Sequence, residues 1–240
     1  MSSSDDLGDG KLVIVCGPTA AGKSALAMRL AEIVPITIIS ADSRQIYRGF
    51  DIGTAKPGRV DRDKVPHAGL DLVEPTQRYS SFAWASTAIA AIARAREDGR
   101  IPLVVGGAGF YVRALVTPEP GLARYDARYL VVDPGAVLRE WIAHRVDTML
   151  TGGWPEEVMR LERDVPEHAP AWQASGYQTV REMVRGHLDA PRAREAVVIA
   201  TRQYAKRQRT WFRHQLPKEQ TTRLDPRAPD AVETLEELVR

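Results

Sequence analysis

The segment GPTAAGKS near the start of the chain limits the fold more than any other feature of the sequence. Its glycines, lysine and serine are spaced as G-x-x-x-x-G-K-S. Backbone amides of such a loop cradle phosphates, the lysine reaches the phosphate oxygens and the hydroxyl binds Mg²⁺. A β-branched apolar run precedes the loop and a run rich in Ala and Leu follows it, which is the strand–loop–helix context that the motif requires. The residues expected to bind a di- or triphosphate are Gly17, Pro18, Thr19, Ala20, Ala21, Gly22, Lys23 and Ser24, with Ser24 also a Mg²⁺ ligand.

Short apolar runs alternate with helix-like runs, which predicts an α/β fold: a parallel sheet of the P-loop NTPase type with helices on both faces and a helical C-terminal part. The expected strands are residues 11–17, 35–40, 101–107 and 128–135. The expected helices are 23–32, 80–99 with Ser81 as its cap, 135–153, 155–164, 176–186, 191–216 and 230–240. Ligands of such sheets bind at the carboxyl ends of the strands, so the segments that follow the first three strands are candidates for a site.

Composition leaves the partner open. The 240 residues carry 33 Lys and Arg against 31 Asp and Glu, a net charge of +2 that neither favours nor excludes nucleic acid. The single cysteine, Cys16, lies in an apolar run, so a buried, reduced thiol is expected. The start is polar and acidic and no apolar run approaches membrane-spanning length, so we expect a cytoplasmic protein without a membrane partner. The expected organisation is a disordered tail over 1–10, a core over 11–225 and a closing helix in 226–240.

A dense polar group follows the second expected strand, in the segment SADSRQIYRGFDIGTAKP. Asp42 stands at the strand end, where a carboxylate holds Mg²⁺ through water, caps a helix or acts as a base; the sequence leaves these roles open. An amide side chain pairs well with an adenine edge, which makes Gln45 a candidate beside Asp42. The residues expected to contact such a base are Asp42, Ser43, Gln45 and Lys56.

Two further segments carry functional signals. Glycines in VVGGAGFYVRAL allow close backbone approach or a simple tight turn, and this strand lacks the acidic residue that kinases and GTPases often place here. In the late helix, Arg202, Lys206, Arg209 and Arg213 are spaced by four, three and four residues. This spacing places them in one stripe along the helix. The stripe, without neighbouring acids, predicts an anionic partner: pyrophosphate, RNA or both.

With these segments in place, the sequence resembles the tRNA dimethylallyltransferases, also called isopentenyl-pyrophosphate transferases. The matching segments are GPTAAGKS, SADSRQIYRGFDIGTAKP, VPHAGLDLVEP, VVGGAGFYVRAL, RVDTML, GY and TRQYAKRQRTWFR, in family order over residues 11–214. The resemblance implies that the loop holds the pyrophosphate of dimethylallyl diphosphate, and that the exocyclic N6 amine of an adenosine beside the tRNA anticodon attacks the allylic carbon. The implied partners are this donor and the tRNA anticodon stem-loop, with Mg²⁺ as cofactor and the protein as a monomer.

The resemblance also assigns roles to individual residues. Asp42 is the expected catalytic base, and Arg202 the expected catalytic arginine that neutralises the leaving diphosphate. Gly107 and Ala108 are expected at the diphosphate end of the site. The remaining cations of the stripe, Lys206, Arg209 and Arg213, are expected to contact the tRNA.

Two features depart from the family pattern. Ala108 stands where the family usually has threonine, and a lost hydrogen bond to a charged group costs about 1.5–3 kcal/mol. The family also carries a helical insertion that helps to grip the anticodon stem-loop. Here only residues 116–128 fill that place, so we expect the insertion to be absent and tRNA binding to be weak.

Three other functions stay open on the sequence alone. The same chemistry on free AMP, ADP or ATP occurs in short relatives that form cytokinins. A small P-loop kinase would turn over ATP without a prenyl donor. An RNA-binding relative that has lost activity would bind tRNA without prenyl transfer.

Overall fold

The computed structural model describes residues 10–117 and 125–240. The predicted disordered tail lies outside the described residues except for Gly10, and part of the predicted insertion point lies outside them as well. None of the helices in the described ranges has the length and apolar character needed to cross a bilayer.

Six parallel strands form one sheet in the order β3-β2-β4-β1-β5-β6. Their bounds are β1 Lys11–Cys16, β2 Ile36–Ala41, β3 His67–Ala68, β4 Ile101–Gly106, β5 Asp126–Val132 and β6 Thr221–Leu224. The four predicted strands and the parallel fold are confirmed. The two short edge strands, β3 and β6, escaped prediction because two to four residues carry too little periodicity to distinguish a strand from a loop.

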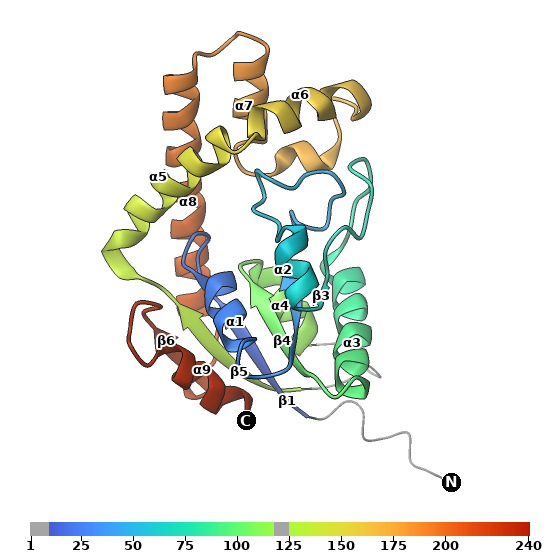
Figure 1. Ribbon diagram of the computed structural model, residues 1–240, viewed down its shortest axis with the longest axis vertical. Helices are drawn as coiled ribbons and strands as arrows, with labels where there is room; N and C mark the ends of the chain where they lie inside the picture. Colours follow the sequence, from blue (N-terminus) through green and yellow to red (C-terminus); the bar gives the residue numbers. More distant parts are fainter. Residues whose placement is uncertain (1–9, 118–124) are drawn as a thin grey trace.

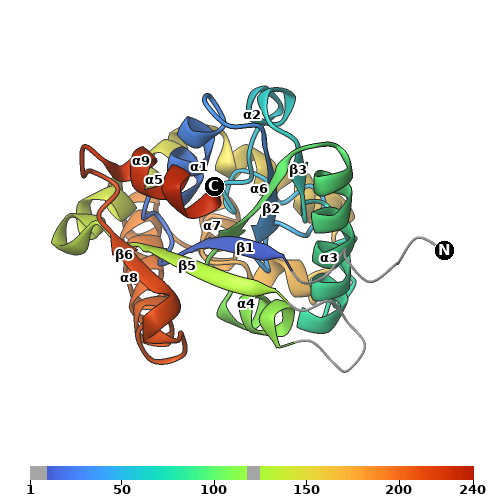
Figure 2. The same ribbon diagram turned by 90° about the horizontal axis from the view of Figure 1, so that it is seen from below.

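Helices cover both faces of the sheet. Their bounds are α1 Lys23–Leu30, α2 Arg59–Lys64, α3 Ser81–Glu97, α4 Gly109–Val116, α5 Leu138–Thr151, α6 Trp154–Asp164, α7 Tyr177–Val184, α8 Ala190–His214 and α9 Ala231–Val239. Short 3₁₀ turns lie at Gly135–Val137, Pro170–Gln173 and Lys218–Gln220. α1 and α9 pack on one face, and α3 and α4 pack on the other (Figure 2).

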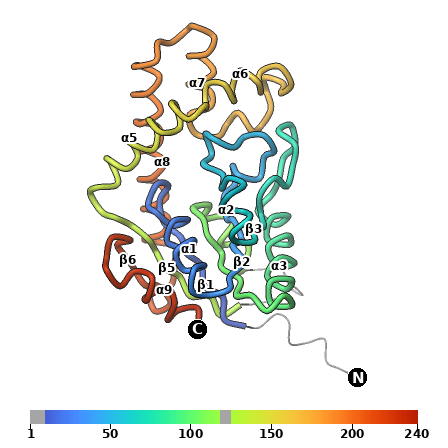
Figure 3. Tube along the Cα trace, viewed as in Figure 1, coloured from blue at the N-terminus to red at the C-terminus, as the bar shows by residue number. Residues whose placement is uncertain are grey.

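A helical lobe stands beyond the carboxyl edge of the sheet (Figure 1). We use this name for α5, α6, α7 and the first half of α8. The second half of α8 continues down to the sheet, so this one helix joins the lobe to the core (Figure 3). Residues at the carboxyl ends of the strands therefore lie between the sheet and the lobe.

Local sequence explains most of the element boundaries. The hydroxyl of Ser80 accepts a hydrogen bond from Ala83 N at 3.0 Å, so the cap of α3 is Ser80 and the predicted cap, Ser81, is the first helical residue. The carboxylate of Asp189 caps α8 in the same way, with Pro191 in the first turn. Cys16 is fully buried as predicted, and burial raises the pKa of its thiol to about 12, so it stays protonated.

Candidate active site

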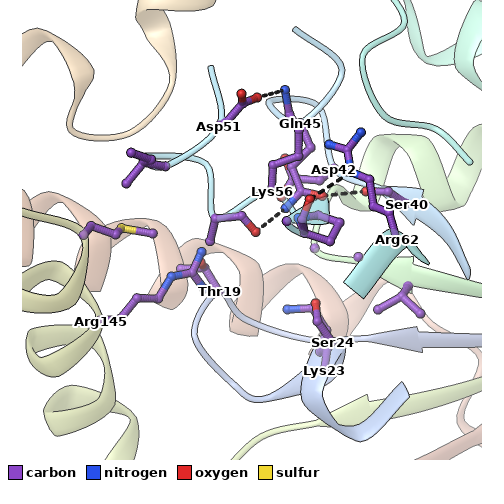
Figure 4. Close-up of a pocket in the computed structure, with 18 of the residues that line it drawn as sticks. Thr19, Lys23, Ser24, Ser40, Asp42, Gln45, Asp51, Lys56, Arg62 and Arg145 are labelled. Carbon is purple, nitrogen blue, oxygen red and sulfur yellow. Dashed lines mark hydrogen bonds and ion pairs between the residues drawn. The ribbon is translucent and has the colours of Figure 1, made fainter. Parts of the chain in front are cut away.

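A cavity of about 1110 Å³ opens where β1, β2 and β4 end below the helical lobe (Figure 4). We call it the loop cavity, because the phosphate loop forms its floor. The residues of its wall that carry the argument below are Thr19, Lys23, Ser24, Asp42, Arg145 and Gln208. They come from the loop after β1, the start of α1, the end of β2, the lobe helix α5 and the late helix α8.

The phosphate loop forms a cradle of backbone N–H groups. Its first glycine, Gly17, lies against β5, where an added Cβ would meet Val132 O at 2.3 Å. Gly22 precedes α1 in a left-handed conformation, with φ of 86°, and no side chain caps the helix. The amides of residues 20–24 donate to no acceptor among the described residues. Free amides at a helix start are a ready anion site, so the loop is shaped for a phosphate chain.

Two cations face this cradle. The Lys23 ammonium donates to Gly17 O at 3.1 Å and to Pro18 O at 2.7 Å. Burial is the main cause that lowers the pKa of Lys23 to about 8; the nearby Arg145 guanidinium contributes in the same direction, and the Asp42 carboxylate opposes both. Arg145 reaches from α5 toward the loop at Thr19 (Figure 4). Burial lowers the pKa of Arg145, and Asp42 again opposes the shift.

Arg145 is the functional candidate that sequence reasoning missed. The segment RVDTML that contains it contributes to the family resemblance, but no role was assigned to its arginine. Lys23 and Arg145 are half-buried cations that repel each other across the same cavity, and a bound anion would relieve this repulsion further than Asp42 alone does. The pair therefore indicates a multiply charged ligand such as a diphosphate.

The amide of Gln208 ties α8 to the phosphate loop and to the end of β4. Its Oε1 accepts from Thr19 N at 2.8 Å, and its Nε2 donates to Gly107 O at 2.8 Å. A Cβ on Gly107 would lie 2.3 Å from Gln208 Nε2, and one on Gly109 would lie 2.4 Å from the Trp211 ring. The glycines of the GGAG segment are thus explained by the close approach of α8.

We expect Gln208→Ala to weaken the binding of inorganic pyrophosphate about 3- to 10-fold, because one or two hydrogen bonds that shape the loop are lost. Calorimetry with pyrophosphate measures this. Gln203, exposed on the same helix, gives the matched control Gln203→Ala, for which affinity stays unchanged. Equal affinity of the Gln208→Ala and Gln203→Ala variants would mean that the loop keeps its shape without the Gln208 hydrogen bonds.

Asp42 lies at the end of β2 as expected, and one of its two carboxylate oxygens is hydrogen-bonded within the protein. Oδ1 accepts from Arg44 N at 2.8 Å, which closes a turn of the type that Asp favours. Oδ2 has no partner among the described residues, and Asp42 lines the loop cavity. One carboxylate oxygen is thus available to a ligand.

The predicted base-contacting residues separate in the structure. Ser43 lies one residue from Asp42 but lines a different cavity, described below. The Gln45 amide is used within the protein: Oε1 accepts from Ser40 Oγ at 2.9 Å, and Nε2 donates to Thr54 O and Ala55 O at 3.2 and 3.0 Å. We therefore propose a supporting role for Gln45 and not contact with an adenine.

Lys56 is also held inside the protein. Its side chain is fully buried and its ammonium bridges Asp51 and Asp71 at 2.6 and 2.7 Å. The lobe secures the same loop, because the buried Glu157 carboxylate accepts from Asp51 N at 3.1 Å and from Tyr177 Oη at 2.5 Å. These contacts fix the wall of the loop cavity, which is the role that we propose for Lys56.

The cationic stripe of α8 does not act as one unit. Arg202 is exposed, donates to Arg139 O at 3.2 Å and lines none of the cavities described here. Arg209 is paired with Asp133 at 2.8 Å. Lys206 and Arg213 are exposed and form no ion pair with a described residue. Our proposal below therefore gives the diphosphate-neutralising role to Arg145 and not to Arg202.

Two smaller cavities meet the loop cavity around Asp42 and Gln208. The inner cavity, of about 60 Å³, extends into the lobe and shares Thr19, Asp42 and Arg145 with the loop cavity. The aromatic cavity, of about 490 Å³, shares Gly107 and Gln208 with it. The side chains that characterise the aromatic cavity are Arg44, Phe110, Tyr111, Tyr204, Arg207 and Trp211.

Ala108 belongs to the aromatic cavity and not to the loop cavity. Its backbone N–H donates to Ala41 O at 3.1 Å, which ties the end of β4 to the end of β2. Gly107 lines both cavities, so of these two predicted diphosphate ligands only Gly107 reaches the loop cavity.

The parallel sheet, the phosphate loop between β1 and α1 and the cationic cavity above them define a P-loop α/β protein built to bind a phosphorylated ligand. The sequence profile of the IPP transferase family matches residues 45–121 and 117–215. The chain belongs to this family.

Individual relatives agree with the family assignment. A tRNA dimethylallyltransferase of Deinococcus radiodurans is 35% identical over 291 aligned positions, covering 92% of this chain and 93% of the relative. One from Gloeobacter violaceus is 34% identical, covering 85% and 89%. The full-length tRNA isopentenylpyrophosphate transferase from Bacillus halodurans superposes with a TM-score of 0.82 at 27% identity, over 95% of both chains. A eukaryotic dimethylallyltransferase acting on tRNA shares the fold, with a TM-score of 0.80 at 20% identity over 95% of this chain and 78% of that one.

These matches confirm the resemblance and bear on the insertion. The two matched pieces of the profile meet at residues 117–121, within the segment where the sequence predicts a missing insertion. The 291 aligned positions exceed the 240 residues of this chain, so the Deinococcus relative carries residues without a counterpart here. The place of that difference stays a prediction, because residues 118–124 lie outside the described part of the chain.

Proposed function

We propose that this protein transfers a dimethylallyl group from dimethylallyl diphosphate to the N6 amine of the adenosine adjacent to a tRNA anticodon. The observation that carries the proposal is a row of adjoining cavities: the loop cavity with Lys23 and Arg145 in its wall, the small inner cavity that joins it at Asp42, and the aromatic cavity that joins it at Gln208. These suit a diphosphate, a five-carbon chain and a nucleobase. The names of the relatives support the same reaction.

In this proposal the loop cavity holds the diphosphate of the donor. The free amides of residues 20–24, Lys23 and Arg145 bind its oxygens and stabilise the negative charge that grows as it leaves. The described residues include no group of three or more His, Cys, Asp or Glu that could hold a metal. The exposed Ser24 hydroxyl lines the cavity and fits Mg²⁺, which keeps waters and binds mainly through substrate phosphates. Bound there, Mg²⁺ would neutralise diphosphate charge.

The proposed chemistry places the acceptor amine beside Asp42. An adenine amine is a weak nucleophile because its lone pair is delocalised into the ring. As the C–N bond forms and the allylic C–O bond breaks, the free Oδ2 of Asp42 takes the amine proton. Such a positioned base contributes about 10²–10⁴-fold. The diphosphate leaves into the loop cavity.

The acceptor base approaches through the aromatic cavity in this proposal. A base must leave its stack to reach a buried centre, and aromatic faces compensate for the lost stacking by about 1–3 kcal/mol per base. The Arg207 guanidinium lies over the Tyr204 ring, 5.8 Å from its centroid, and Phe110 is 71% exposed beside them. The exposed Lys206 and Arg213 remain our candidates for contacts to RNA phosphates.

The deciding experiment offers two acceptors at once. The protein is incubated with dimethylallyl diphosphate, Mg²⁺, unmodified tRNA and AMP, and the nucleosides are analysed by mass spectrometry. We expect the prenyl group on tRNA adenosine. Transfer mainly to AMP would favour the free-nucleotide enzyme, and tRNA binding without any transfer would favour an inactive RNA-binding relative.

A further inference from the structure

Arg145 is the cation that the proposed function places against the leaving diphosphate, and no bond of its own holds it there. Its half-buried guanidinium forms no hydrogen bond or ion pair with a residue in the described ranges. An arginine side chain has several rotatable bonds and loses much conformational freedom when it is fixed. The position of its guanidinium at the loop cavity therefore depends on where the backbone of α5 lies.

The start of α5 is fixed largely by side-chain hydrogen bonds. The turn that leads into it contains Gly135, with φ of 68°, and none of the residues Gly135–Val137 is buried. The Arg209 guanidinium, from α8, donates to Asp133 Oδ2 at 2.8 Å, to Asp133 Oδ1 at 2.5 Å and to Gly135 O at 2.6 Å. Asp133 Oδ1 also accepts from Gly135 N at 3.0 Å. Arg209 therefore helps to set where α5 begins.

The other end of α5 is bound to α8 in the same way. Arg194 donates to the two carboxylate oxygens of Asp147 at 2.5 and 2.8 Å, and Arg202 donates to Arg139 O between the two ends. Arg194, Arg202 and Arg209 follow one another at intervals of eight and seven residues, which is about two helical turns each. They contact α5 in the reverse order, as two antiparallel helices require. We call these three arginines the arginine ladder.

The two outer contacts of the ladder fix geometry more than they add stability. Both are forks in which one guanidinium bonds two carboxylate oxygens, an arrangement that constrains distance and orientation together. The side chains of Arg194 and Asp147 are 43% and 45% exposed, and those of Arg209 and Asp133 are each 31% exposed. Ion pairs so accessible to solvent contribute little to the free energy of unfolding. Loss of one fork should therefore release α5 without unfolding the protein.

α5 lies against the end of the phosphate loop, so its position bears directly on the diphosphate site. A Cβ added to Gly22 would lie 3.7 Å from the Trp141 ring. Arg145 follows Trp141 by four residues, about one turn further along the helix, and lies between the two forks. A tilt or shift of α5 at either end therefore moves the guanidinium relative to the loop amides. A misplacement of about 1 Å in a catalytic site can cost about 10²-fold in rate.

We propose that the arginine ladder positions Arg145 over the phosphate loop, with Arg194 and Arg209 as positioning residues that hold α5 at its two ends. The proposal rests on the proposed function, which gives Arg145 its role toward the diphosphate. It also accounts for two members of the cationic stripe that the sequence predicts. Arg202 and Arg209 bond α5 and not an anionic ligand, and Arg194, two turns earlier, continues the same contact.

A double-mutant cycle separates this role from general damage to the protein. The affinity for inorganic pyrophosphate is measured by calorimetry, and donor kcat/KM is measured with tRNA, in wild type, Arg209→Gln, Arg145→Gln and the double variant. We expect Arg209→Gln to lower both quantities about 10-fold when Arg145 is present, and less than about 2-fold in the Arg145→Gln background, because the ladder acts through that side chain. Equal losses in the two backgrounds overturn the inference. A flatter salt dependence of tRNA affinity in Arg209→Gln would assign Arg209 to an RNA phosphate and overturn it too.

The other end of the ladder gives a rescue test, which also serves if Arg209→Gln fails to fold. Arg194→Asp should weaken pyrophosphate binding in the same direction, and addition of Asp147→Arg should restore the affinity by re-forming the pair with reversed charges. Failure of this rescue overturns the inference. Arg192→Gln is the matched control, since Arg192 is exposed on α8 and its one ion pair among the described residues is with Asp189, the cap of the same helix; its values should equal those of wild type.

Because pyrophosphate binding is read separately from transfer, the two proposals fail in different ways. Coupling of Arg209 to Arg145 without any transfer leaves only this inference, whereas transfer without coupling leaves only the proposed function.

Discussion

Asp42→Asn is expected to lower the rate of prenyl transfer by about 10²-fold or more, the contribution typical of a positioned general base. Asparagine is nearly the same size and its oxygen can still accept from Arg44 N, the bond that Asp42 Oδ1 makes at 2.8 Å. The turn after β2 should therefore survive. What is lost is the proton acceptor of the free Oδ2.

Single-turnover transfer with saturating donor and tRNA measures this effect without interference from product release. Pyrophosphate and tRNA affinities should stay near those of wild type. Asp63, exposed on α2 at the rim of the loop cavity, provides the control Asp63→Asn, which removes a negative charge near the same cavity and should retain the wild-type rate. A near-normal rate in Asp42→Asn would remove Asp42 from the role of base.

The sequence predicted the structure best where one short segment determines both the local fold and the site that it forms. The G-x-x-x-x-G-K-S spacing specifies the loop, its strand and its helix together, and the structure places the expected strands and helices there. The same logic predicted the place of Asp42 beside the loop, since the carboxyl end of a parallel strand is a fixed place in the fold; its role as base stays a prediction. Both predictions depend on local order along the chain alone.

The order of residues along the chain could not predict roles that depend on how distant elements pack together. The helical spacing of Arg202 and Arg209 is correct, but only the neighbouring elements reveal that Arg139 and Asp133 are their partners. Gln45 and Lys56 were expected to contact the acceptor base, but both side chains are bonded within the protein. A polar side chain near a site has no visible partner until the fold brings one to it.

For Arg145 the error was the opposite one: the sequence analysis assigned no role to a side chain that faces the site. It lies on α5, whose buried residues include Ile142 and Val146, and the apolar periodicity of that helix does not distinguish it from a solvated arginine. Only the position of α5 above the carboxyl edge of the sheet directs its side chain at the phosphate loop. The signal available in the sequence was the RVDTML segment, which matches the family pattern and from which a role for its arginine could have been inferred.

The interaction of Arg145 with Lys23 leads to the second large effect that we expect. Arg145→Gln should reduce kcat/KM for the donor about 10²–10³-fold, the cost typical of removing one group that stabilises developing negative charge. The same change should alter how activity depends on pH. Burial is the main reason that the pKa of Lys23 lies at about 8, and the Arg145 charge is the next.

The sign of the pH effect follows from which form of Lys23 binds the donor. Below its pKa Lys23 is cationic and attracts the diphosphate; above it the charge is lost, so kcat/KM for the donor should fall as the pH rises through about 8 in wild type. Removal of the Arg145 charge leaves burial in place but ends the repulsion, so the pKa of Lys23 rises and the decline should move to higher pH in Arg145→Gln.

Donor kcat/KM measured between about pH 7 and pH 10 covers the range in which a perturbed lysine titrates. Arg139→Gln, exposed on the same helix α5, should keep the wild-type profile. A flat wild-type profile, or a decline that stays at the same pH in Arg145→Gln, would contradict the coupling of these two cations.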